Sequence, residues 1–184
     1  SHILAANLDQ VFLFVTLAQP ETPTEFVDRF LVTAKAYDVP VVIVVNKVDL
    51  LPTDDEYLQG YCYLYRSLGY EVITCSVATG QGMALLQEKI AGKVSLLAGN
   101  SGVGKSSLIN QLQDEICMET GQISQKIERG KHTTRHSEII PLEDGAYIMD
   151  TPGFSSMDVP GFEKEDLWTC YPEFAPHEPY CKFQ

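Results

Sequence analysis

Short apolar runs along this chain alternate with stretches in which apolar residues have helical spacing. The runs Gln10–Leu17 and Pro40–Val45 are rich in β-branched and aromatic residues and have the length of buried strands. The segment 24–37 between them carries apolar residues at helical spacing, namely Phe26, Phe30, Leu31 and Ala34. This order predicts a βαβ unit, whose two strands are parallel.

The alternation continues to about residue 113. Further elements are predicted in the order helix, strand, helix, strand, helix at residues 53–68, 71–75, 83–91, 93–98 and 105–113. Regular alternation of strands and helices implies a mostly parallel sheet with helices on both faces. The sequence therefore predicts an α/β fold with three layers.

The pattern changes in the last third of the chain. Residues 114–132 lose periodicity and are rich in polar residues, which predicts a loop. The runs Arg135–Leu142 and Ala146–Met149 flank a Glu-Asp-Gly turn and predict a hairpin. The tail from Ser155 contains four prolines, and within it residues 163–169 have helical character.

The composition is that of an ordinary globular domain. The 184 residues, 45% hydrophobic and 21% charged, suit one α/β domain with at most a short appendage. The apolar runs are too short to span a bilayer, so we expect a cytoplasmic protein without a membrane segment. A net charge of −12 argues against a broad basic face for nucleic acid. Because the chain begins at Ser1 and not at Met, we expect a fragment or a processed product.

The five cysteines are odd in number and show no C-x-x-C spacing. They are Cys62, Cys75, Cys117, Cys170 and Cys181. We interpret them as reduced thiols in preference to disulfides.

The strongest motif is a glycine-rich loop between a predicted strand and a predicted helix. It spans Gly99–Ser106 and reads G-x-x-x-x-G-K-S. Backbone N–H groups of such a loop surround phosphates, Lys105 reaches the β- and γ-phosphates, and the Ser106 hydroxyl ligates Mg²⁺. The alternative is a purely structural glycine-rich turn. We assign nucleotide binding to Asn100, Ser101, Gly102, Val103, Gly104, Lys105, Ser106 and Ser107.

A second motif, N-K-V-D at 46–49, follows a predicted strand and distinguishes the base. Asp49 can accept hydrogen bonds from the ring N–H and the exocyclic amine of guanine, and adenine lacks that amine. Alone, the motif is equally consistent with a strand-end turn, but beside the phosphate loop it predicts guanine recognition. The base-binding residues are then Asn46, Lys47 and Asp49, with an imperfect S-A-x loop at Ser76, Val77 and Ala78.

Two further motifs are candidates for Mg²⁺ and γ-phosphate contacts. The D-T-P-G sequence at 150–153 follows a predicted strand, where Asp150 would hold Mg²⁺ through water and the Gly153 N–H would contact the γ-phosphate. Upstream lies H-T-T-R at 132–135, in which we favour Thr134 over Thr133 as the Mg²⁺ and γ-phosphate ligand. The alternatives are a strand-end turn and ordinary strand-entry threonines.

The order of these motifs differs from that of Ras-like GTPases, in which the phosphate loop comes first. Here N-K-V-D and S-V-A precede the phosphate loop, and H-T-T-R and D-T-P-G follow it, which is a circular permutation. With A-A-N-L-D-Q at 5–10, D-R-F-L at 28–31 and G-K-H-T-T-R at 130–135, the chain resembles the RsgA (YjeQ) family of ribosome small subunit-dependent GTPases.

The resemblance implies a circularly permuted Ras-like GTPase domain with a P-loop NTPase fold, which uses GTP and Mg²⁺. It also implies a role in late maturation of the 30S ribosomal subunit, contact with 16S rRNA mainly through other domains, and a monomer. We expect the GTPase domain at 1–158 and the start of a C-terminal region at 159–184. The family's N-terminal OB-fold would be absent and its zinc module truncated, with Cys181 resembling the first zinc ligand; Cys170 and His177 are interpreted as structural.

The group that orients water in hydrolysis is not fixed by the motifs. Ras-like enzymes place a glutamine after the D-x-x-G glycine, but this chain has Phe154, so intrinsic hydrolysis should be slow. Our candidate is His132, and the alternative is a solvated loop histidine. Besides a GTPase, the residues allow a nucleotide-gated binding module with negligible hydrolysis; an ATP-dependent enzyme is disfavoured by Asn46 and Asp49.

Overall fold

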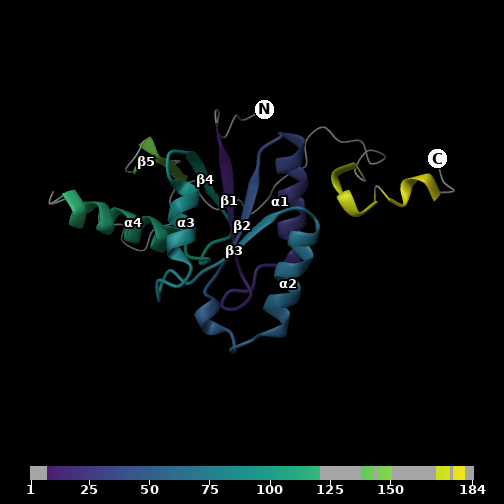
Figure 1. Ribbon diagram of the computed structural model, residues 1–184, viewed down its shortest axis with the longest axis horizontal. Helices are drawn as coiled ribbons and strands as arrows, with labels where there is room; N and C mark the ends of the chain where they lie inside the picture. The colour runs from purple at the N-terminus through teal and green to yellow at the C-terminus, as the bar shows by residue number, and fades with distance from the viewer. Residues whose placement is uncertain (1–7, 121–137, 143–144, 151–168, 175, 181–184) are drawn as a thin grey trace.

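The structure is a computed structural model of the chain, and it describes residues 8–120, 138–142, 145–150, 169–174 and 176–180. Within them, one six-stranded sheet carries helices on both faces (Figure 1). The strands are β1 (Gln10–Thr16), β2 (Val41–Asn46), β3 (Glu71–Thr74), β4 (Val94–Ala98), β5 (Glu138–Pro141) and β6 (Tyr147–Asp150). The α-helices are α1 (Thr24–Ala36), α2 (Glu56–Ser67), α3 (Met83–Ile90) and α4 (Lys105–Thr120). Three 3₁₀ turns complete the described elements: η1 (Val48–Leu50), η4 (Pro172–Phe174) and η5 (Glu178–Tyr180).

The strand order in the sheet is β3-β2-β1-β4-β6-β5. Every neighbouring pair is parallel except β5 and β6, which are antiparallel. The predicted parallel α/β fold and the predicted hairpin are therefore both confirmed. In β1 all seven residues are buried, as expected for a strand in the middle of a sheet that is covered on both faces.

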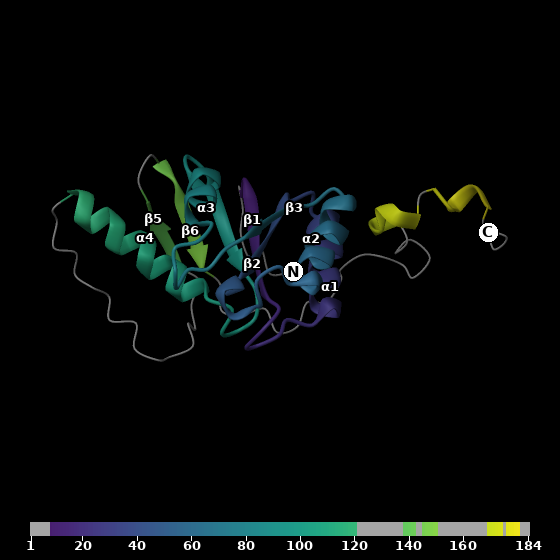
Figure 2. The same ribbon diagram turned by 60° about the horizontal axis from the view of Figure 1, so that its bottom comes forward.

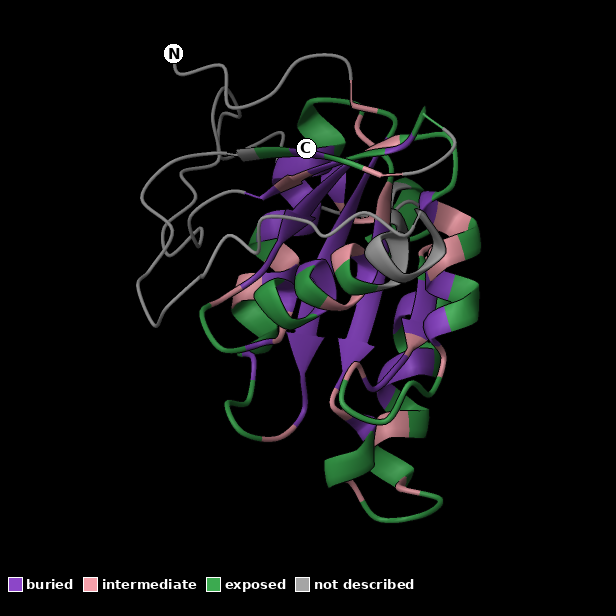
Figure 3. Ribbon diagram, turned by 90° about the vertical axis from the view of Figure 1, so that its left-hand side faces the viewer, coloured by how far each residue is buried: buried purple, intermediate pink, exposed green. Residues whose placement is uncertain are grey.

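Alternate residues of the strands enter two separate cores, because successive side chains point to opposite faces of a sheet. Leu13 of β1 packs with Phe30 of α1 and Tyr65 of α2 in one core. Phe12 packs with residues of α3 and α4, among them Leu108, in the other. Figures 1 and 3 show the three layers, with buried strands between helices whose outer faces are exposed.

The helix after the phosphate loop is longer than predicted. The sequence pattern placed its end near Gln113 and a loop from Asp114, whereas α4 continues to Thr120. That loop prediction is wrong for 114–120, because this segment contains no glycine or proline before Gly121, and Glu115, Met118 and Glu119 have good helix propensity. The helix therefore continues past the point at which the apolar residues lose their helical spacing.

The described part of the tail consists of short 3₁₀ turns and lies beside the layer formed by α1 and α2 (Figure 2). Cys170 is buried there, and the rings of Tyr171 and Phe174 lie 5.6 Å apart. Most of the predicted helix at 163–169 lies outside the described residues. No helix in the described part of the chain has both the length and the apolar character needed to cross a membrane.

Candidate functional site

The described parts of the predicted motifs lie at the carboxyl ends of parallel strands. Asn46 ends β2, Ser76 comes two residues after β3, the phosphate loop follows β4, and Asp150 ends β6. Parallel strands end at the same edge of a sheet, and α/β folds bind ligands at that edge. The fold therefore brings together four segments that are distant in the sequence.

Asn46 connects three of these segments through its side-chain amide, which is only 3% exposed. Its Nδ2 donates to the carbonyl oxygen of Val103 in the phosphate loop at 2.8 Å. Its Oδ1 accepts from the backbone N–H of Val77 at 3.1 Å and from the Cys75 thiol at 3.6 Å. The asparagine of the N-K-V-D motif thus holds the phosphate loop and the S-V-A loop in fixed positions.

Two glycines of the phosphate loop are required by close approaches to other segments. Gly99 has φ of 135° and lies against the carbonyl of Phe14 in β1, so a Cβ there would overlap the backbone of β1. Gly104 has φ of 104°, and its Cβ would overlap Asn46 Nδ2. At Gly99 the positive φ and the backbone of β1 leave no room for a side chain, and at Gly104 a side chain would require a strained φ and a shift of Asn46.

Lys105 is buried at the first turn of α4, with 9% of its surface exposed. Its Nζ donates to the carbonyl oxygens of Gly99 at 2.6 Å and Asn100 at 2.9 Å. Burial lowers the pKa of this ammonium from its ordinary value, and the negative charge of Asp150, itself buried, opposes that shift. A desolvated cation at the start of a helix is suited to an anionic ligand such as phosphate.

The hydroxyl-bearing residues that follow Lys105 are accessible. Ser106 and Ser107 are exposed in the first turn of α4, and Ser101 is exposed at the tip of the loop. In contrast, the side chain of Val103 is fully buried in the core formed with α3 and α4. Val103 therefore anchors the loop through its side chain and leaves only backbone groups for a ligand.

The guanine motif continues from β2 into the 3₁₀ turn η1. Lys47 has a left-handed backbone with φ of 63°, and its Nζ donates to the carbonyl oxygen of Gln19 at 2.7 Å. Asp49, in the turn itself, is exposed. An accessible carboxylate at the same edge of the sheet as the phosphate loop has the chemistry required to bind a guanine edge.

The S-V-A loop is closed by hydrogen bonds around Ser76, which is fully buried. The Ser76 N–H donates to the carbonyl of Gln81 at 2.9 Å, and its hydroxyl accepts from the N–H of Thr79 at 3.2 Å. Ala78 is exposed at the tip of this loop. The loop therefore presents Ala78 to solvent, and base binding by this loop stays a prediction.

Four predicted site residues lie outside the described residues: His132, Thr134, Gly153 and Cys181. Of the proposed Mg²⁺ ligands, Ser106 and Asp150 are described, and both lie at the carboxyl edge of the sheet. Within the described ranges, no group of three His, Cys, Asp or Glu residues is placed to hold a metal ion.

Sequence reasoning missed the loop that follows β1. It contributes the Gln19 carbonyl that binds Lys47, and the ring of Pro20 lies over Gly102. A backbone carbonyl and a ring contact leave no characteristic pattern of residue types, so no motif could have revealed this loop.

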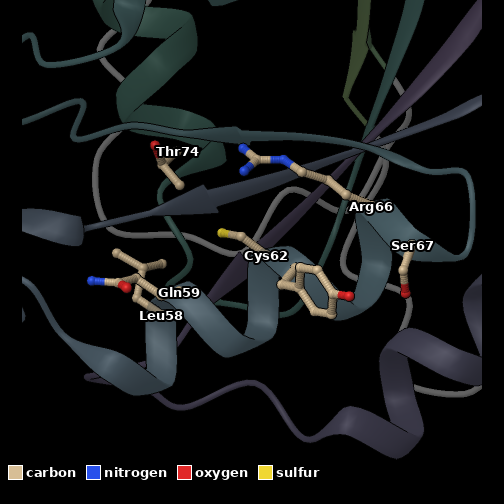
Figure 4. A pocket seen from close by; sticks show the side chains of 7 residues that line it. Leu58, Gln59, Cys62, Arg66, Ser67 and Thr74 are labelled. Carbon is tan, nitrogen blue, oxygen red and sulfur yellow. The ribbon is translucent and has the colours of Figure 1, made fainter.

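A separate groove of about 520 Å³ lies between α2 and the edge strand β3 (Figure 4). It is lined by Leu58, Gln59, Cys62, Tyr63, Arg66, Ser67 and Thr74. None of the predicted nucleotide-binding residues contributes to it. The candidate site is therefore defined by converging motifs and not by this groove.

A mostly parallel α/β sheet with a G-x-x-x-x-G-K-S loop and an N-K-V-D turn at its carboxyl edge defines a P-loop domain with permuted GTPase motifs. The family model described as RsgA GTPase matches residues 1–160. The chain therefore belongs to the RsgA GTPase family, which confirms the resemblance inferred from its motifs.

Curated relatives and solved structures agree with this assignment. The chain is 55% identical over 180 residues to the small ribosomal subunit biogenesis GTPase RsgA of Agathobacter rectalis, covering 97% of this chain and 59% of that protein. Identity to the protein of the same name from Phocaeicola vulgatus is 44%, covering 100% and 59%. The chain thus spans about three fifths of the length of these relatives.

Two crystal structures share the fold. YjeQ from Thermotoga maritima superposes with a TM-score of 0.74 at 36% identity, covering 92% of this chain and 56% of that one. YloQ, described as a circularly permuted GTPase, superposes with a TM-score of 0.71 at 34% identity, covering 97% and 56%. The predicted fold class is therefore confirmed.

Proposed function

We propose that this chain binds GTP and hydrolyses it to GDP and phosphate. The observation that carries the proposal is the hydrogen-bonding position of Asn46, which joins the guanine motif to the phosphate loop. The loop N–H groups and Lys105 would hold the phosphates, and Asp49 would read guanine with support from Lys47 and the S-V-A loop. On this basis we assign binding of the nucleotide phosphates to residues 100–107.

The buried ammonium of Lys105 and the exposed hydroxyl of Ser106 fit a nucleotide bound with Mg²⁺. Mg²⁺ would be held by Ser106, by Asp150 through water and by Thr134, and when bound it would neutralise negative charge on the phosphates. The Lys105 ammonium donates to two backbone carbonyl oxygens in this structure. On nucleotide binding it would donate to phosphate oxygens instead. The Gly153 N–H would contact the γ-phosphate.

We propose His132 as the group that positions the attacking water, since Phe154 cannot do so. Replacing His132 with Ala should abolish the GTP hydrolysis that 30S subunits stimulate, measured as phosphate release. GTP binding, measured by titration, should be preserved. His177→Ala, at an exposed histidine of the described tail, is the matched control. Unchanged stimulated turnover of His132→Ala would rule out this role.

The names of the relatives support a role in biogenesis of the small ribosomal subunit. We propose that the chain forms part of a monomeric cytoplasmic GTPase that acts in late 30S maturation and contacts 16S rRNA mainly through other domains. Residues 1–158 would form the GTPase domain and 159–184 the start of a C-terminal region. Cys181 would be one ligand of a Zn²⁺ site there.

The second candidate is a nucleotide-gated binding module without significant hydrolysis, and Phe154 favours it. Single-turnover GTP hydrolysis with and without 30S subunits separates the two. Stimulated turnover supports the enzyme, whereas nucleotide-dependent subunit binding without turnover supports the module.

The base preference is tested by calorimetric titration with GDP, GTP and ATP in Mg²⁺. We expect guanine nucleotides to bind and ATP not to bind, and Asp49→Ala to lose that preference. Asp114→Ala, at an exposed aspartate of α4, is the control for charge removal. Equal ATP binding by the unmodified chain would contradict guanine recognition.

A further inference from the structure

The loop that joins β1 to α1, residues 17–23, is closed by hydrogen bonds between Thr16, the last residue of β1, and Thr22 within the loop. The N–H of Thr22 donates to the carbonyl of Thr16 at 2.8 Å, and the Thr22 Oγ1 accepts from the N–H of Thr16 at 3.0 Å. The Thr16 hydroxyl donates to the carbonyl of Pro20. Both threonines are buried, with 0% and 4% of their surface exposed. The loop is thus held from inside by two hydroxyl groups.

The sheet order places this loop between the two halves of the nucleotide site. β1 lies between β2, which carries the guanine motif, and β4, which carries the phosphate loop. The loop contacts both: the Gln19 carbonyl accepts from Lys47 Nζ at 2.7 Å, and a Cβ built on Gly102 would lie 3.4 Å from Pro20 Cδ. The β1–α1 loop is therefore positioned to fix Lys47 and Gly102 together.

We propose that the β1–α1 loop is a third wall of the nucleotide site and that Thr22 is a positioning residue for guanine nucleotide binding. This inference rests on the proposed GTP binding. Thr22 holds the loop in the conformation that presents the Gln19 carbonyl to Lys47. Lys47 lies two residues before Asp49, so a fixed Lys47 side chain orders the base-binding turn before the ligand arrives.

The energetic reason is preorganisation. A lysine side chain loses considerable rotamer entropy when it is ordered, and a site in which it is already ordered binds more tightly. The Gln19 carbonyl supplies that order in the protein without ligand. If the loop conformation were lost, Lys47 would have to be ordered when the nucleotide binds, and the binding free energy would be less favourable by that entropic cost.

The test compares Thr22→Val with Thr22→Ser in titrations with GDP. Valine has the shape of threonine but removes the acceptor for the buried Thr16 N–H, whereas serine retains it. We expect Thr22→Val to weaken GDP binding by about tenfold, the effect of one lost buried hydrogen bond, and Thr22→Ser to bind like the unmodified chain. Equal GDP binding by Thr22→Val and the unmodified chain would overturn the proposal.

A double-mutant cycle separates positioning from general destabilisation. Lys47→Met keeps an unbranched side chain that is one atom shorter and removes the donor to Gln19. If Thr22 acts through Lys47, the double variant binds GDP about as weakly as the weaker single variant, because both remove the same contact. If the two losses in affinity add fully, Thr22 acts by another route and the proposal is wrong.

Two controls keep the outcome interpretable. The unmodified chain is titrated first with GDP and ADP. If it shows no preference for GDP, the proposed function itself is contradicted. If it prefers GDP and Thr22→Val binds GDP with unchanged affinity, only the loop proposal is contradicted. If Thr22→Val melts below the assay temperature, Thr16→Val replaces it, because it removes the hydroxyl bound to the Pro20 carbonyl and keeps the Thr16 N–H. The same tenfold loss, and the same overlap with Lys47→Met, is then expected.

Discussion

Asn46 Nδ2 lies 2.8 Å from the carbonyl oxygen of Val103, and this hydrogen bond crosses from the end of β2 to the phosphate loop after β4. The two strands are not neighbours, since β1 lies between them. One buried amide therefore connects the N-K-V-D motif and the phosphate loop over 57 residues of sequence. These two segments would respond to a nucleotide as one unit.

We expect Asn46→Asp to weaken GDP binding by at least about a hundredfold and to lower the free energy of unfolding by about 3 kcal/mol. The carboxylate has no N–H for Val103 and brings a charge into a buried position. Titration and urea denaturation measure the two effects. Asn110→Asp, at an exposed position of α4, makes the same chemical change and should alter neither by more than about 0.5 kcal/mol. Normal affinity in Asn46→Asp would show that the amide does not organise the site.

Gly104→Ala should abolish nucleotide binding and destabilise the fold. Its Cβ would overlap Asn46 Nδ2, and its φ of 104° is unfavourable for alanine. Either the phosphate loop or Asn46 must then move. Binding is measured by titration and stability by thermal melting.

The control for this variant is Gly60→Ala. Gly60 lies in α2, and a Cβ there would have no neighbour within 4 Å. Alanine has the higher helix propensity, so this variant should be more stable by up to about 1 kcal/mol and should bind nucleotide normally. Normal binding by Gly104→Ala would mean that the loop tolerates the side chain and that the packing argument is wrong.

The positions of the motifs could be predicted from the sequence because they depend on local pattern. An apolar run followed by N-K-V-D or by a glycine-rich loop places those residues at strand ends, and alternation with helices places the ends on one edge. The contacts between segments could not be predicted in this way. The bond from Asn46 to Val103 and the bond from Lys47 to Gln19 both end on backbone carbonyls, which every residue type carries.

The D-R-F-L sequence illustrates the same limit. It supported the family resemblance, and the structure shows that it serves packing: Phe30 and Leu31 are buried in the core under α1 and α2. The Arg29 carbonyl accepts from the Thr33 hydroxyl at 2.8 Å. Its aspartate, Asp28, accepts a hydrogen bond from Tyr65, a partner 37 residues away.

Lys105→Met should prevent nucleotide binding and leave the fold intact. The methionine side chain fits an apolar environment and removes a charge that is costly to bury. Because burial lowers the pKa of Lys105 in the folded protein, the unfolded chain binds the proton more tightly, and stability rises with pH between the lowered pKa and the ordinary value of 10.5. The unmodified chain should therefore gain stability relative to Lys105→Met as pH rises through this window.

Denaturation in urea at about pH 7 and about pH 10 measures that difference. Lys89→Met is the control, since Lys89 is partly exposed and pairs with Glu71 at 2.8 Å. An unchanged difference between Lys105→Met and the unmodified chain across the window would show that the ammonium of Lys105 is not desolvated.

At neutral pH, Asp28→Asn should melt at a higher temperature than the unmodified chain. Burial is the main cause that raises the pKa of Asp28, with Glu173 and Glu25 adding to it, and the hydrogen bond from Tyr65 opposes the shift. A carboxyl whose pKa is raised by folding loses stability as pH rises from its ordinary value of 3.8 through the folded value. Asparagine keeps an acceptor for the Tyr65 hydroxyl at 3.2 Å and removes the charge.

Thermal melting of Asp28→Asn and Asp28→Ala across acidic and neutral pH tests this account. Alanine also removes the charge but leaves the Tyr65 hydroxyl without its acceptor, so Asp28→Ala should melt below Asp28→Asn at every pH. The gap between Asp28→Asn and the unmodified chain should widen as pH rises through the folded pKa and then stay constant. Because the negative charge of Glu173 helps to raise the pKa of Asp28, Glu173→Gln should narrow that gap. A lower melting temperature for Asp28→Asn at neutral pH would show instead that the charged carboxylate stabilises the fold.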